Sequence, residues 1–179
     1  MSELRTNRIV PRDGLVSGTG IGGGIIQVKS TTKTDAFQKA SNSSFQDVTG
    51  LSVSITPTRS DSKILVCYDM SWSTSNGHMS CRLMRDSTPI KVGDASGNRT
   101  QCTGQQHYSG NGQNQYDIFQ VSGTHMDSPA TTSSVTYKMQ VGTPYNSSYD
   151  CRVNYQGDDT NAAWAGRTAS TITVMEVSG

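Results

Sequence analysis

The sequence predicts an all-β fold, an antiparallel β-sandwich of the jelly-roll type that follows an extended N-terminal arm. Apolar and polar residues alternate at a period of two in one segment after another, and no window has a sustained apolar pattern at helical spacing. Segments rich in Gly, Asn and Ser separate the alternating stretches, as turns separate the strands of a sandwich. A length of 179 residues suits one domain with a core of its own.

The chain begins with a charged arm, residues 1–13 (MSELRTNRIVPRD), and a glycine-rich spacer, residues 14–24 (GLVSGTGIGGG). The spacer contains the spacing G-x-G-x-x-G, but a dinucleotide-binding turn needs a strand before it and a helix after it. Here an arm with Pro11 precedes the glycines and strand-like sequence follows them. We therefore interpret residues 1–24 as an arm and a flexible hinge, and residues 25–179 as the β-sandwich domain.

The alternating segments give the order of the strands. We expect about eight to ten strands, at residues 25–34, 45–48, 51–55, 64–70, 79–83, 116–121, 135–141, 151–155 and 172–174. Segments 73–78, 93–114 and 142–167, apart from the strand at 151–155, are too rich in Gly, Asn, Ser and Gln to form strands. We expect these segments to be loops that carry any variable recognition.

Two of the expected strands are apolar on both faces. The second apolar face consists of Leu65, Cys67, Phe119 and Val121. A strand that is apolar on both sides is what an oligomer interface requires, because each face then has a partner. The alternative is a strand that a loop of its own chain covers.

The composition limits the classes of partner. Charged residues make up 16% of the chain and the formal net charge is +1, while Ser and Thr number 25 and 21. This balance argues against nucleic acid as a main partner, since only Arg5, Arg8 and Arg12 form a basic group and acidic residues partly offset them. The sequence has no apolar secretion signal and no stretch that approaches a membrane span, so we expect synthesis in a cytosol without membrane insertion.

Four cysteines are spread along the chain without a C-x-x-C pair: Cys67, Cys81, Cys102 and Cys151. Free thiols are the expected state in a cytosol, and whether the thiols pair after release into an oxidising medium is left open. A four-cysteine zinc site is the alternative, but such sites usually contain close cysteine pairs.

Catalytic signatures are absent from the sequence. His78, His107 and His125 lie in or next to loop-like segments, and none belongs to a motif such as G-x-S-x-G. Asp158 and Asp159 are adjacent in a turn-like sequence rather than placed as a pair of catalytic carboxylates. We therefore expect no enzyme activity, no cofactor and no metal.

A sugar-binding surface is the chemical hypothesis that the residues support. Carbohydrate recognition uses a flat ring against the C–H face of the sugar, with amide or carboxylate groups on its hydroxyls. The candidate carbohydrate contacts fall near polar segments and are Trp72, His107, Tyr145, Tyr149 and Trp164. The alternative is that Trp72 ends a strand inside the core and that Trp164 pins a long loop.

Both ends of the chain carry distinctive segments: SELRTNRIVPRDGL at 2–15, GGIIQVKSTTKTD at 23–35, FQDVTGLSVSITPTRSDSKILV at 45–66 and STITVMEV at 170–177. These segments resemble structural proteins of tailed bacteriophages, notably marine and cyanobacterial ones, which are described as tail-fibre or virion structural proteins. The middle of the chain, residues 67–168, matches only loosely, at 83–93 (LMRDSTPIKVG).

The resemblance implies a virion component without enzymatic activity, a trimer whose jelly-roll body is similar to the tumour-necrosis-factor or C1q type. An arm, a hinge and a β-domain also indicate a module that is held by its N-terminus and displays its body. The residues of the arm that would anchor it to other virion proteins are Leu4, Arg5, Arg8, Ile9, Val10 and Arg12.

The sequence thus predicts a structural component of a phage virion, assembled in the cytoplasm of the host bacterium. It would be a homotrimer of the tail-fibre type, or another surface-displayed protein, and would contact a host surface glycan through its loops. One alternative is a decoration, knob or head-fibre protein of the capsid, and another is a free carbohydrate-binding module, which would not need the arm. The location in tail or head, the receptor and the host are left open.

Overall fold

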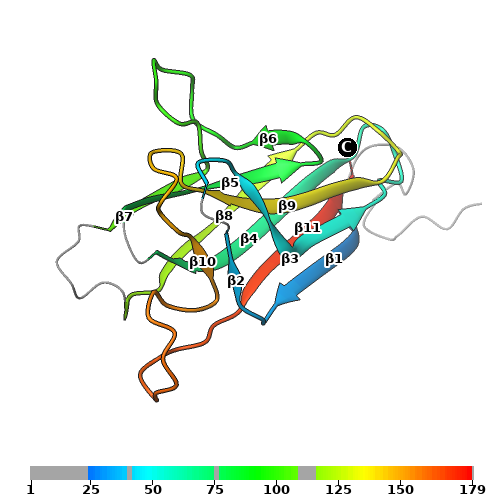
Figure 1. Cartoon of the computed structure of the whole chain (residues 1–179). Helices are drawn as coiled ribbons and strands as arrows, with labels where there is room; N and C mark the ends of the chain where they lie inside the picture. The colour runs from blue at the N-terminus through cyan, green and yellow to red at the C-terminus, as the bar shows by residue number, and fades with distance from the viewer. Residues whose placement is uncertain (1–23, 40–41, 75–76, 109–115, 179) are drawn as a thin grey trace, which may run out of the picture.

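Two antiparallel sheets pack against each other in the computed structural model of the chain, which describes residues 24–39, 42–74, 77–108 and 116–178 (Figure 1). No α-helix occurs among these residues. The strands are β1 (Ile25–Lys33), β2 (Phe37–Gln38), β3 (Gln46–Ile55), β4 (Lys63–Ser73), β5 (Gly77–Arg85), β6 (Thr88–Ile90), β7 (Gly104–Tyr108), β8 (Phe119–Asp127), β9 (Val135–Gly142), β10 (Arg152–Val153) and β11 (Ser170–Val177).

Each sheet contains four main strands, of which β7 in the second sheet is the shortest, with five residues. In the first sheet the order is β1-β11-β4-β8, and the short strands β10 and β2 continue the sheet past the end of β11. In the second sheet the order is β3-β9-β5-β7, with β6 pairing with the other end of β5. All of these pairs are antiparallel.

The connections between these strands are those of a jelly roll. Along the chain, β1 lies in the first sheet, β3 in the second, β4 in the first, and β5 and β7 in the second, after which β8, β9 and β11 alternate again. Neighbours within a sheet are therefore mostly distant in sequence, as in a double Greek key. The predicted fold class, an antiparallel jelly-roll sandwich, is confirmed.

The core lies between the sheets and follows from the alternation. Every second side chain of a strand points inward, so the two sheets contribute interdigitating apolar rows. The first sheet contributes Ile64, Val66, Tyr68, Met70, Trp72, Ile172 and Val174, and the second contributes Val53, Ile55, Met79, Cys81, Leu83, Val135, Tyr137, Met139 and Val141.

Buried carboxylates hold the sandwich together where the core ends. Glu176 of β11 is fully buried, and its carboxylate accepts hydrogen bonds from Gln27 Nε2 and from the backbone N–H and hydroxyl of Thr58, each at 2.7 Å. Asp127 of β8 accepts bonds from Tyr137 Oη at 2.7 Å and from Arg85 at 2.9 Å. Because each carboxylate binds residues of other strands or turns, these contacts fix the end of the sandwich at which β1 begins.

Several strand and loop predictions need correction. The expected loop at 73–78 is shorter, because Ser73 ends β4 and Gly77 and His78 begin β5, and the strand expected at 116–121 is instead Phe119–Asp127. Residues 104–108 were expected to be loop, but they form β7 at an edge of the second sheet, where a polar strand is stable because one neighbour, β5, supplies its hydrogen bonds. The strand expected at 151–155 is only two residues long. Phe119 and Val121 face the core rather than a second apolar face, because β8 begins only at Phe119.

The two ends of the described chain lie side by side. Ile25 pairs with Val177, and Ser178 N donates to Gly24 O at 3.2 Å. The loops around residues 143–150 and 156–169 lie at the opposite end of the sandwich (Figure 1). Gly24, the first described residue, therefore lies at the end of the sandwich far from these loops.

Candidate functional site

Two surfaces of the sandwich have features beyond those that folding requires. One is the outward side of the first sheet, which we call the smooth face; the other is an aromatic pocket at the loop end. The smooth face consists of Val28, Ser30 and Thr32 of β1, Thr171, Thr173 and Met175 of β11, Leu65, Cys67 and Asp69 of β4, and Ser122, Thr124 and Met126 of β8.

The register of the strands places an apolar row across the smooth face. Met175 pairs with Val28 on one side and with Leu65 on the other, and Leu65 pairs with Met126. The two outer members of the row, Val28 and Met126, are 51% and 50% exposed. Four apolar side chains in line on an open sheet form a contact surface that lacks a partner within the described part of the chain.

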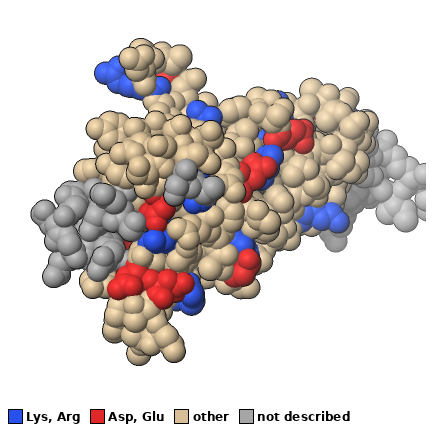
Figure 2. Space-filling model, viewed as in Figure 1, with Lys and Arg blue, Asp and Glu red and all other residues tan. Residues whose placement is uncertain are grey.

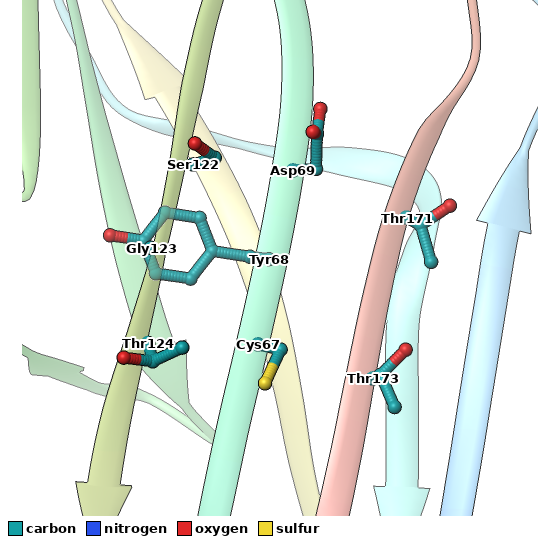
Figure 3. A pocket seen from close by; sticks show the side chains of 8 residues that line it. All are labelled: Cys67, Tyr68, Asp69, Ser122, Gly123, Thr124, Thr171 and Thr173. Carbon is teal, nitrogen blue, oxygen red and sulfur yellow. The ribbon is translucent and has the colours of Figure 1, made fainter.

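The neighbouring rows of the smooth face are small and polar. Figure 3 shows Thr124, Cys67 and Thr173 side by side on β8, β4 and β11. Hydroxyl groups bond to one another across strands, as in the 2.8 Å contact between Ser30 Oγ and Thr173 Oγ1. Asp69 is the one charged side chain among these twelve residues. Lys63, two residues before Leu65 on the same side of β4, adds a second charge at the edge of this side, where its Nζ donates to Ser128 Oγ at 2.8 Å. Away from that edge the surface can be covered with little cost of desolvating charge.

A glycine shapes the middle of the smooth face. A shallow depression of about 300 Å³ lies over Cys67, Gly123 and their neighbours. The Tyr68 ring runs beneath β8 (Figure 3), and its hydroxyl accepts a hydrogen bond from Lys91 Nζ at 2.9 Å. A Cβ on Gly123 would lie 2.7 Å from the Tyr68 hydroxyl and 2.6 Å from Lys91 Nζ, so glycine permits this close approach.

The outer face of the second sheet differs in chemistry. Asp47 accepts hydrogen bonds from Lys138 Nζ and Gln140 Nε2, each at 2.7 Å. The Arg82 guanidinium lies 3.8 Å from the centre of the Phe45 ring. Figure 2 shows acidic and basic side chains next to one another in several places, without a continuous basic or acidic patch on the face seen there.

The aromatic pocket forms where β5 and β7 meet the loop after β9. His78 and His107 are direct partners in the β5–β7 ladder, and their rings stack with centroids 4.1 Å apart. Tyr145 packs edge-on against His78 at 5.2 Å, and Tyr149 lies 6.2 Å from Tyr145. Four rings from three segments therefore meet at one place.

Hydrogen bonds hold the loop that carries the two tyrosines. Thr143 is fully buried and accepts a bond from Lys39 Nζ at 3.3 Å. Asn146 N donates to the Thr143 carbonyl, and the Asn146 side chain accepts from Ser148 N at 2.8 Å. These contacts hold the loop backbone in one conformation, and this conformation fixes the positions of the two tyrosine rings.

Tyr149 and Tyr145 have different roles in this loop. A Cβ on Gly77, whose φ is +77°, would lie 1.9 Å from the Tyr149 ring, so this ring packs directly on the backbone at the start of β5. Tyr145 is 74% exposed. Tyr149 thus fixes the loop to the sheet, whereas most of the Tyr145 ring faces solvent.

The cavity beside Tyr145, which we call the tyrosine pocket, has a volume of about 340 Å³. It is lined by His78, Asn98, Thr100, Gln105, Pro144 and Tyr145. Desolvation of its ring and the neighbouring His107 lower the pKa of His78, so this imidazole is neutral at pH 7. The pocket therefore combines an exposed ring with uncharged polar groups.

The predicted carbohydrate contacts divide into three groups. The structure brings His107, Tyr145 and Tyr149 together, as described above. Trp72 is 2% exposed and belongs to the core, so its prediction as a surface contact is wrong, because its inward position in β4 places the ring between the sheets. Trp164 is 54% exposed and packs edge-on against Tyr116 at 5.1 Å, away from the other three.

Sequence reasoning missed four polar residues of the tyrosine pocket, His78, Asn98, Thr100 and Gln105, and also Pro144, which the sequence places in the expected loop from residue 142. The sequence places His78 in a polar turn and the other three polar residues in a presumed loop of 22 residues, from 93 to 114. Their proximity depends on the pairing of β5 with β7, which no local pattern indicates. The predicted anchoring residues, Leu4 to Arg12, lie outside the described residues.

The described part of the chain contains no disulfide and no cluster of potential metal ligands. All four cysteines are free. Burial raises the pKa of the Cys81 thiol to about 12, so this thiol is unreactive at neutral pH. Among the described residues, no three His, Cys, Asp or Glu side chains converge to hold a metal ion.

Comparison with known proteins adds no information about these sites. No family model and no curated protein matches this chain. Within the described ranges there is also no helix of the length and apolar character needed to cross a membrane.

Proposed function

We propose that the chain is a non-enzymatic structural component of a bacteriophage particle, a homotrimeric surface-displayed protein of the tail-fibre type that is anchored by its N-terminal arm. The single observation that carries the assembly role is the smooth face. It spans the four long strands of the first sheet, carries charge only at Asp69 and, at its edge, at Lys63, and contains two apolar side chains that are half exposed.

Self-association is the natural use of such a face. Burying apolar surface contributes about 25 cal/mol per Å², and hydroxyl groups already bonded to each other, such as Ser30 with Thr173, lose little when water leaves. The lean composition supports this reading, since only 32% of the residues are hydrophobic. A domain with a small core gains proportionally more stability from a covered second face.

The direction of the domain supports display. The arm joins the sandwich at Gly24, beside Ser178, and the long loops lie at the opposite end. Attachment through residues 1–24 would thus point the loops away from the particle. The segment resemblance to tailed-phage structural proteins favours a virion as the place of attachment, with assembly in the bacterial cytoplasm.

Light scattering on the purified full chain tests the assembly role. We expect a mass of three times 19.2 kDa, about 58 kDa, that persists on dilution. Deleting residues 1–20 should leave the fold and the assembly of three chains intact but should abolish incorporation into particles. A concentration-independent single-chain mass would contradict the trimer and favour a monomeric capsid-decoration protein, while incorporation without the arm would contradict anchoring.

A further inference from the structure

We propose that the tyrosine pocket binds an uncharged saccharide, with the Tyr145 ring as the platform for the sugar and the side chains of Asn98, Thr100 and Gln105 as partners for its hydroxyl groups. This inference goes beyond the proposed assembly role and does not depend on it, because every residue of the pocket comes from one chain.

The platform is exposed but held in place. Tyr145 is 74% exposed, yet its edge contact with His78 and the neighbouring Tyr149 ring fix its orientation. The stacked His107 in turn packs against His78, with ring centroids 4.1 Å apart. A ring that is ordered before binding loses little entropy when a ligand arrives, so a flat apolar face in this state is ready for the C–H face of a pyranose.

The polar groups around the platform suit hydroxyl groups. Gln105 Nε2 donates to Ser80 Oγ at 3.2 Å, and this bond fixes the orientation of the amide, so its carbonyl oxygen points away from Ser80. The side chains of Asn98 and Thr100 line the same pocket and form no hydrogen bond with other described residues. Amide and hydroxyl groups both donate and accept, as recognition of sugar hydroxyls requires.

The absence of charge in the lining defines the class of sugar. The residues that line the pocket include no Lys, Arg, Asp or Glu. The lowered pKa of His78, caused first by desolvation and then by His107, keeps that ring neutral at pH 7. An acidic sugar would bring a buried carboxylate without a cationic partner, so a neutral hexose or N-acetylhexosamine fits best.

The two histidines do not form a metal site in this arrangement. Their rings stack at an interplanar angle of 28°, so their faces oppose each other and their nitrogen atoms do not aim at a common point. No third ligand joins them among the described residues. The pair acts as a support for Tyr145 instead.

An array of immobilised neutral and acidic oligosaccharides, probed with the full-length protein at pH 7, tests the proposal. Neutral glycans that are retained are then titrated in solution against the wild type and three variants. We expect Tyr145→Ala to weaken binding at least about tenfold and Tyr145→Phe to stay within about twofold of wild type. Trp164→Ala, the matched exposed aromatic at the same end, should also stay within about twofold.

Thermal unfolding of each variant separates binding from folding. Because Tyr145 and Trp164 are largely exposed, all three variants should retain the wild-type fold. Retention of acidic glycans alone, retention of none, or equal affinity of Tyr145→Ala and wild type would each overturn the proposal. Loss of binding in Trp164→Ala but not in Tyr145→Ala would move the site to the Tyr116–Trp164 pair. None of these results bears on the trimer, which the solution mass tests separately.

Discussion

The outer faces of the two sheets differ, although both sheets are antiparallel and built from four main strands. On the second sheet, Asp47 binds Lys138 and Gln140 on the neighbouring strand, and Arg82 stacks on Phe45. These contacts complete the face within one chain. On the smooth face of the first sheet, an exposed row that includes Val28 and Met126 lies beside rows of hydroxyl groups.

The difference indicates which surface of a β-sandwich is free to assemble. A face covered by ion pairs and amides competes poorly for another protein, because association would strip water from each charge. A face of methyl, thioether and paired hydroxyl groups has little to lose and apolar area to gain. Lean composition alone does not locate such a surface; the register of the strands does.

The largest expected effect comes from a charge on the smooth face. Thr173→Arg introduces a cation at the centre of this face and should reduce the solution mass from three chains to one. The matched control is Thr136→Arg on the second sheet, since Thr136 bonds to Ser54 across strands at 2.8 Å as Thr173 bonds to Ser30. The control should keep the mass of the wild type by light scattering.

The free energy of unfolding of each arginine variant should lie within about 0.5 kcal/mol of that of the wild-type chain in the same assembly state, because neither side chain enters the core. A trimer that survives Thr173→Arg, or that Thr136→Arg dissociates, would show that a different surface carries the assembly.

An intermediate effect comes from the buried charge of the first sheet. Burial raises the pKa of Glu176, but the hydrogen bonds from Gln27 and Thr58 outweigh it and lower the pKa from 4.5 to about 2. The folded state therefore gains stability above pH 4.5, roughly 3 kcal/mol, which is lost as the pH falls toward 2. Glu176→Gln should reduce the free energy of unfolding by about this amount at pH 7 in urea titrations.

The pH dependence distinguishes this explanation from a packing defect. The difference between wild type and Glu176→Gln should shrink steadily between pH 5 and pH 2, since protonated Glu176 no longer accepts charge-assisted bonds. A difference that stays constant over that range would mean that the carboxylate charge contributes nothing.

The smallest effect is expected on the second sheet. Asp47 and Lys138 are both partly exposed, so Asp47→Asn should cost less than about 1 kcal/mol in urea titrations. Desolvation raises the pKa of Asp47, while Lys138 and Gln140 lower it by more. This loss of stability should be smaller at high salt. A loss of stability as large as that of Glu176→Gln would contradict the view that the charged outer face of the second sheet contributes little to stability and is suited to solvent rather than to a partner.

Much of the fold followed from local pattern. Alternation at 51–55, 64–70, 79–83 and 135–141 predicted strands that the structure contains, because burial of every second side chain is a property of each segment alone. The polar strand β7 escaped prediction, since its stability comes from its neighbour β5 rather than from its own side chains.

Exposure of individual aromatic residues could not be read from the same pattern. Trp72 and Trp164 both border polar segments in the sequence, yet one lies in the core and the other on the surface. Likewise Leu65 was assigned correctly to the outer face, while Val121 was not. The pattern gives the two faces of a strand but gives their direction only where the strand boundaries are known.

The sequence by itself determined an all-β domain with a lean core, near-neutral charge and long polar loops, because composition and period-two alternation act on each segment independently. The tertiary structure alone decided that Met175 would lie between Val28 and Leu65, and that His78, His107 and Tyr145 would meet in one pocket. These neighbours are set by strand order and register, which depend on how distant segments pair across the sheets and are not encoded in any single strand.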